Sequence, residues 1–148
     1  MHGKPLFDLE RFLKAQDPMF DTVLAELRHG RKQSHWMWFV FPQLRELAQT
    51  PTARRYGIVS LSEAADYLQH RLLGPRLTAC VEIILALHGR SLNEIFGSPD
   101  DVKFRSSMTL FMLVSGNESV FQKALHRYCD GVMDQMTLDL LRSPHTSS

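Results

Sequence analysis

Apolar residues recur at three- and four-residue steps along most of the chain, which is the spacing of one face of an α-helix. The clearest stretch is a single face that ends at Gly89, formed by Leu73, Leu77, Cys80, Ile84 and Leu87. Similar spacing occurs in shorter segments at 9–13, 20–27, 64–68, 104–111, 120–128 and 138–141. The pattern therefore predicts a helical protein.

Helix start signals precede several of these segments. Ser60 with Glu63, and Ser91 with Glu94, have the Ser-x-x-Glu spacing of a capping box, which satisfies free backbone N–H groups at a helix start. No hairpin dipeptide separates alternating apolar runs, as strands would require. Because starts, stops and periodicity agree, we predict an all-α fold, a single-domain orthogonal bundle of about eight helices over residues 1–142.

Two segments fit this description less well. The aromatic run Trp36–Phe41 is compatible with an extended segment, because Pro42 disfavours helical backbone at the residue before it. Residues 143–148 are small and polar after a proline, so we expect a disordered tail. The predicted core contains five of the periodic or aromatic positions: Phe39, Leu77, Ile84, Met108 and Phe111.

Composition narrows the classes of function. The 148 residues carry a formal net charge of +1 and are 44% hydrophobic, which describes an ordinary globular protein without the basic field that general nucleic-acid binding requires. No apolar run approaches the roughly 18 residues that would cross a membrane, so we expect a cytoplasmic protein with no membrane partner. The oligomeric state stays open.

Metal and cofactor signals are missing from the sequence. Cys80 and Cys129 lie far apart, and neither belongs to a Cys/His pattern of zinc-site spacing. The chain also lacks a glycine-rich phosphate loop. We therefore expect no metal and no resident cofactor.

The first candidate for chemistry is the aromatic phrase, residues 30–43, with the sequence GRKQSHWMWFVFPQ. Both tryptophans, Trp36 and Trp38, can belong to the core or form a stacking platform for a planar ligand. His35 can serve as an acid, a base or a phosphate contact, or make a structural hydrogen bond. Flanking side chains that can bind a ligand are Arg31, Lys32 and Gln43, although helix-end solvation and capping also explain them.

The second candidate is the polar phrase, residues 98–111, with the sequence SPDDVKFRSSMTLF. Asp100 and Asp101 stand in the first turn of a predicted helix, where carboxylates favour the helix dipole. Three hydroxyls in an otherwise apolar stretch, Ser106, Ser107 and Thr109, either bond back to the preceding turn or line a polar cleft. Lys103 lies on the same predicted helix, between Asp101 and Ser106. A separate basic and aromatic cluster is formed by Arg54, Arg55 and Tyr56.

These two phrases, with YGIVSLSEAADYLQHRLLGPRL between them, resemble a family of small bacterial proteins classified only as a domain of unknown function, some of them carrying a misplaced "calpastatin" label. The resemblance runs from about Phe7 to Leu141 and implies one all-helical domain. The chain departs from the family pattern at Glu46-Leu47-Ala48, where a Gly-Leu-Gly-like turn is usual, so we expect the loop before Tyr56 to differ in shape.

A more distant likeness is to the NADAR proteins, which act on N-glycosidic bonds of ADP-ribose-type molecules. The likeness is one of organisation, an aromatic motif before a polar helix, and no NADAR catalytic residue is matched by position. Aromatic rings for a base, cations for a pyrophosphate and a carboxylate for an oxocarbenium-like centre are compatible with such a ligand.

Two hypotheses of different classes follow. In the first, the two phrases form a cleft for a nucleotide or ADP-ribose-like ligand, with hydrolysis of an N-glycosidic bond by Asp101 or Asp100 as the carboxylate and His35 as acid or base. The ligand is then bound by residues of both phrases and by Tyr56: Arg31, Lys32, Trp36, Trp38, Gln43, Lys103, Ser106, Ser107 and Thr109. In the second, the domain is a non-catalytic protein-interaction module whose signature residues are structural.

Overall fold

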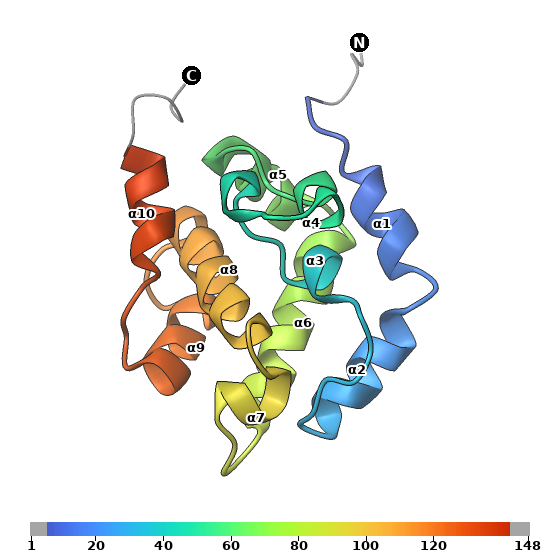
Figure 1. Ribbon diagram of the computed structural model, residues 1–148, viewed down its shortest axis with the longest axis vertical. Helices are drawn as coiled ribbons and strands as arrows, with labels where there is room; N and C mark the ends of the chain where they lie inside the picture. Colours follow the sequence, from blue (N-terminus) through green and yellow to red (C-terminus); the bar gives the residue numbers. More distant parts are fainter. Residues whose placement is uncertain (1–5, 143–148) are drawn as a thin grey trace.

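A computed structural model of the protein describes residues 6–142 (Figure 1). This part of the chain contains ten α-helices and one 3₁₀ helix, and its β-type pairing is limited to one isolated bridge between Leu44 and Ile58. The all-α prediction is confirmed. The tail predicted over 143–148 lies outside the described residues.

The helices follow one another with short connections. In chain order they are α1 (Glu10–Gln16), α2 (Phe20–Arg28), α3 (Met37–Val40), the 3₁₀ helix η1 (Arg45–Leu47), α4 (Pro51–Arg55), α5 (Leu61–Gln69), α6 (Leu73–Ala86), α7 (Leu92–Phe96), α8 (Asp100–Ser115), α9 (Val120–Cys129) and α10 (Gln135–Arg142). The count exceeds the predicted eight because α3 and α4 are single turns, too short to show a periodic pattern.

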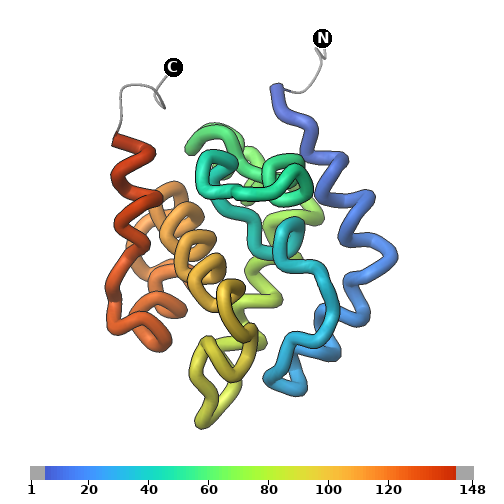
Figure 2. Tube along the Cα trace, viewed as in Figure 1, coloured from blue at the N-terminus to red at the C-terminus, as the bar shows by residue number. Residues whose placement is uncertain are grey.

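The two longest helices organise the bundle. Helix α6 packs against α2, α5 and α9, while α8 packs against α5, α7 and α9. The chain passes from α1 and α2 on one side of the molecule to α8, α9 and α10 on the other, with α3 and α4 between them (Figure 2). All five residues predicted for the core are buried: Phe39, Leu77, Ile84, Met108 and Phe111. No helix among residues 6–142 is long and apolar enough to cross a membrane.

The aromatic run forms a helical turn, so the alternative of an extended segment is wrong. The N–H groups of Val40 and Phe41 donate to the carbonyls of Trp36 and Met37 at 3.2 and 3.0 Å. The restriction by Pro42 falls on Phe41 alone, which leaves the helical region with φ −123° and ψ 71° and ends the turn.

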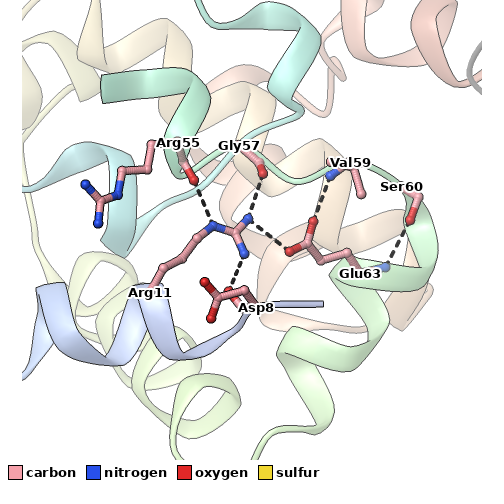
Figure 3. Close-up of polar contacts among 7 residues, drawn as sticks. All are labelled: Asp8, Arg11, Arg55, Gly57, Val59, Ser60 and Glu63. Carbon is pink, nitrogen blue, oxygen red and sulfur yellow. Dashed lines mark hydrogen bonds and ion pairs between the residues drawn. The ribbon is translucent and has the colours of Figure 1, made fainter. Parts of the chain in front are cut away.

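An ion pair between Arg11 and Glu63 links α1 to α5 (Figure 3). Arg11 Nη2 lies 3.0 Å from Glu63 Oε2, and the side chains are only 13% and 2% exposed. The same guanidinium donates to the backbone carbonyls of Arg55 and Gly57 at 2.8 and 2.9 Å, and to that of Asp8. The other carboxylate oxygen, Glu63 Oε1, accepts from Val59 N–H at 2.8 Å. These contacts fix the segment after α4 against both helices.

A buried amide makes a second connection between helices. Gln16 Nε2 donates to the Phe39 carbonyl at 2.6 Å and to the Tyr67 hydroxyl at 3.0 Å, and Gln16 Oε1 accepts from Arg76 at 3.3 Å. Burial raises the pKa of the Tyr67 phenol, so this group stays neutral as the amide's partner. The contacts join α1, α3, α5 and α6.

Replacing Glu63 by Gln is expected to lower the free energy of unfolding by about 3–5 kcal/mol, because the Arg11 cation loses its buried partner. Urea denaturation of the variant and the wild type measures the difference. The matched control is Glu82→Gln on α6, where the side chain is exposed and a change within about 0.5 kcal/mol is expected. An equally small change for Glu63→Gln would contradict the structural role given to the ion pair.

Candidate functional site

The aromatic phrase and the polar phrase meet in the core. The ring of Phe41 packs edge to face on that of Phe104, with 5.2 Å between centroids, and Phe96 of α7 stacks on Phe104 at 5.0 Å. Aromatic pairs of this kind contribute stabilisation beyond that of the apolar area that they bury. The contact sets α3 and the loop after it against the first half of α8.

A cleft of about 490 Å³ opens beside this contact, and we call it the signature cleft. The aromatic phrase lines it with Trp38 and Gln43. The polar phrase lines it with four residues of the α8 start: Pro99, Val102, Lys103 and Ser106. The remaining wall comes from η1, the segment up to α4, and the start of α10: residues 46–50, Ala53, Asp134 and Met136.

Trp38 and Lys103 face one another at this cleft. Lys103 Nζ lies 5.8 Å from the centre of the Trp38 ring, within the range of a cation–π contact. Both side chains are partly exposed. Tyr56 lies close to both, because it lines a small second cavity together with Trp38, Gln43 and Lys103.

The position of Gln43 is set by the backbone on either side. Its carbonyl accepts from Ile58 N–H at 2.9 Å, and Arg45 N–H donates to the Ile58 carbonyl at 2.8 Å. Gly57 permits this approach, since a Cβ built on it would lie 2.4 Å from the Arg45 Cα. The backbone at Gln43 is therefore held by two hydrogen bonds to Ile58, beside the isolated bridge between Leu44 and Ile58.

The three predicted catalytic residues lie outside the lining of the signature cleft. Asp100 pairs with Lys32 at 3.0 Å and with Lys103 at 3.6 Å. Asp101 accepts from Val102 N–H at 2.8 Å and from the Asn93 amide at 3.2 Å. His35 is exposed on the segment before α3. Both carboxylates are thus engaged in contacts at the start of α8.

The two tryptophans have different surroundings. Trp36 is fully buried, and its Nε1–H donates to Glu26 at 2.9 Å. The Lys32 ammonium lies 5.2 Å from the centre of its ring. Trp36 is therefore part of the core, whereas Trp38 contributes to the wall of a cleft.

Glu26 of α2 holds the segment that leads into the aromatic run. Its carboxylate accepts from the N–H groups of Gln33 and Ser34 at 2.7 and 2.9 Å, from the Ser34 hydroxyl at 2.5 Å, and from Trp36. Partial burial opposes ionisation, but these hydrogen bonds outweigh it and lower the pKa of Glu26 to about 2.

The three hydroxyls of the polar phrase have different partners. Ser106 Oγ donates to the Val102 carbonyl at 3.2 Å and also lines the signature cleft. Thr109 Oγ1 donates to the Arg105 carbonyl at 2.8 Å. Ser107 Oγ is buried and has no hydrogen-bond partner in the described part of the chain. Back-bonding to the preceding turn thus accounts for two of the three.

The two basic clusters open into different hollows. Arg31 and Lys32 line a hollow of about 390 Å³ beside α7, whereas Arg54 and Arg55 line one of about 640 Å³ near the Arg11–Glu63 pair. Neither cluster contributes to the lining of the signature cleft. The cation at that cleft is Lys103.

Metal ligands do not gather anywhere within residues 6–142, where no group of three or more His, Cys, Asp or Glu side chains is arranged to hold an ion. Burial raises the pKa of the Cys80 thiol to about 12, so this cysteine stays protonated at neutral pH.

Sequence reasoning missed three residues that shape the site: Gln16, Glu26 and Asp134. The first two bind partners that lie seven or more residues away in the sequence, and no local motif marks them. The structure places Asp134 at the start of α10 and in the wall of the signature cleft. Its position two residues before a second cleft residue, Met136, carries no recognisable pattern.

Comparisons with known proteins identify relatives of the chain. A family model described as "Protein of unknown function (DUF1810)" matches residues 6–141. The chain is similar to the conserved hypothetical protein Rv1873 from Mycobacterium tuberculosis, whose crystal structure is known, with 52% sequence identity and a TM-score of 0.91. The match covers 94% of this chain and 99% of that chain. A search of curated proteins found no match. The resemblance to an uncharacterised helical family is confirmed.

Replacing Glu26 by Gln is expected to destabilise the protein by about 1–2 kcal/mol at pH 7, because hydrogen bonds to a charged acceptor are lost. The low pKa of about 2 makes this contribution present above about pH 4.5 and lost as the pH falls towards 2. The melting temperatures of variant and wild type should therefore converge over that interval. A gap that stays constant down to pH 2.5 would contradict this role of the carboxylate.

Proposed function

The chain belongs to the DUF1810 family of proteins of unknown function, and we propose that it binds a nucleotide or an ADP-ribose-like small molecule in the signature cleft. The observation that carries the proposal is the convergence of both signature phrases on one concave surface. Trp38 and Gln43 reach it from the aromatic phrase, and Lys103 and Ser106 reach it from the polar phrase.

The chemistry of the lining supports a ligand with an aromatic base and an anionic group. The indole of Trp38 offers a flat surface for stacking, and the Gln43 amide offers one acceptor and two donors for a base edge. Lys103 supplies a cation within reach of the same space. A volume of about 490 Å³ falls within the range of roughly 300–1,000 Å³ that is usual for small-molecule sites.

The proposed activity is binding rather than hydrolysis by the predicted acids. Cleavage of an N-glycosidic bond by a carboxylate requires that group at the reacting sugar carbon. Asp100 is engaged by two lysines and Asp101 by the start of α8, outside the cleft lining. The likeness to NADAR proteins supports only the choice of ADP-ribose among the ligands to test.

A thermal-shift and calorimetric screen with AMP, NAD and ADP-ribose tests the proposal. Ligand at a hundredfold excess over its dissociation constant is expected to add about 2.7 kcal/mol to the stability of the wild type. Trp38→Ala and Lys103→Met should lose most of that added stability, each judged against its own ligand-free melt. The Lys103→Met change keeps most of the apolar stem and removes the charge.

The matched controls are His35→Ala and Asp101→Asn, which change residues outside the cleft lining and should keep the ligand shift. If these controls lose binding while Trp38→Ala keeps it, the ligand binds outside the signature cleft. If no probe stabilises the wild type, the nucleotide proposal fails and the protein-interaction hypothesis takes its place.

A further inference from the structure

We propose that Asp134 recognises the ribose of the ligand by accepting hydrogen bonds from its vicinal hydroxyl groups. This inference rests on the proposed function, because it assigns a second contact within the same cleft. It concerns a residue that lies 31 positions beyond Lys103 in the sequence and belongs to neither signature phrase.

The Asp134 carboxylate is held in place from one side. Its Oδ2 accepts from Thr137 N–H at 2.9 Å and from the Thr137 hydroxyl at 2.6 Å. Thr137 is fully buried, so this pair of contacts is fixed by the packing of α10. Half of the carboxylate is therefore committed to the start of the helix.

The backbone of Asp134 is held from α8. Its N–H donates to Thr109 Oγ1 at 2.8 Å, and the same hydroxyl donates to the Arg105 carbonyl at 2.8 Å. Thr109 is fully buried. A hydroxyl of the polar phrase thus acts through Asp134, which gives Thr109 a positioning role in the cleft although it does not line it.

The other oxygen, Asp134 Oδ1, is open to a ligand. No hydrogen bond or ion pair to it is present within residues 6–142, and the buried side-chain polar atom that lacks a partner there is Ser107 Oγ. Oδ1 is therefore exposed, and Asp134 lines the cleft that also contains Trp38 and Lys103. One carboxylate oxygen is fixed by Thr137, and the other is accessible on a residue that lines the cleft.

The charge of this group selects what it can bind. An ionised carboxylate accepts hydrogen bonds and donates none, so it favours hydroxyl or amine donors and repels phosphate. Lys103 in the same cleft has the opposite preference. With a base on Trp38 and a phosphate at Lys103, the neutral donor groups of a nucleotide that remain are the hydroxyls of its ribose.

The test compares AMP with 2′,3′-dideoxy-AMP by isothermal titration calorimetry. The wild type should bind AMP at least about tenfold more tightly than the dideoxy compound, which is the effect of one charge-assisted hydrogen bond. In Asp134→Asn, an amide NH₂ group takes the place of the free oxygen Oδ1, so the acceptor for the ribose hydroxyls is lost. The remaining oxygen of Asn still caps α10. This variant should lose the preference for AMP while keeping the affinity for the dideoxy compound.

Two variants of Thr137 separate positioning from packing. Thr137→Val removes the hydroxyl that holds Oδ2 and should reduce the preference for AMP, whereas Thr137→Ser keeps the hydroxyl and should preserve it. Asp139→Asn is the charge-matched control on the same helix, at an exposed position that pairs with Gln135, and it should leave the preference unchanged.

The outcomes distinguish this inference from the proposed function. Equal binding of the two nucleotides by the wild type, or an undiminished preference in Asp134→Asn, would overturn the role of Asp134 and leave the signature cleft as a nucleotide site. Failure of the wild type to bind either nucleotide would overturn both. Loss of the preference in Asp139→Asn would show that general charge, rather than a fixed carboxylate, produces it.

Discussion

The arrangement of the cleft depends on the ion pair between Arg11 and Glu63. Much of the segment from η1 to the start of α5 is exposed, and its apolar contacts with the core include those made by Tyr56 and Ile58. The guanidinium binds carbonyls at both Arg55 and Gly57, and the carboxylate binds the N–H of Val59 (Figure 3). Separating the two partners of a buried pair leaves a charge without its counterion, so conformations that move α1 away from α5 are disfavoured. The pair determines where the wall formed by η1 and α4 stands.

Capping motifs and apolar spacing in the sequence were sufficient to predict most of the fold. The Ser91–Glu94 capping box is present with both of its hydrogen bonds, and the apolar face of α6 is buried as its spacing predicted. At Ser60 the hydroxyl caps as expected, but Glu63 uses its carboxylate on Val59 and Arg11 instead of on the cap residue. Long-range partners compete with local motifs, and a local pattern cannot reveal them.

The candidate site was predicted less completely, for a related reason. Trp38, Gln43, Lys103 and Ser106 do line one cleft, but other residues of the same two phrases, such as Trp36 and Asp101, do not. One residue of separation on a helix turns a side chain by about 100°, so Asp101 lies outside the lining although Val102 forms part of it. Trp36 precedes α3 and is buried in the core, whereas Trp38, two residues later, lines the cleft. Sequence adjacency groups residues that a helix then distributes over different faces.

Because the two tryptophans have different environments, the intrinsic fluorescence of the protein reports on two separate events. Trp36 is sealed in the core with its indole N–H bonded to a carboxylate, so its emission follows the integrity of the fold. Trp38 stands at the cleft beside a lysine ammonium, so its emission responds to whatever enters there. A single excitation therefore records both unfolding and occupancy, and substituting either indole assigns each signal to its source.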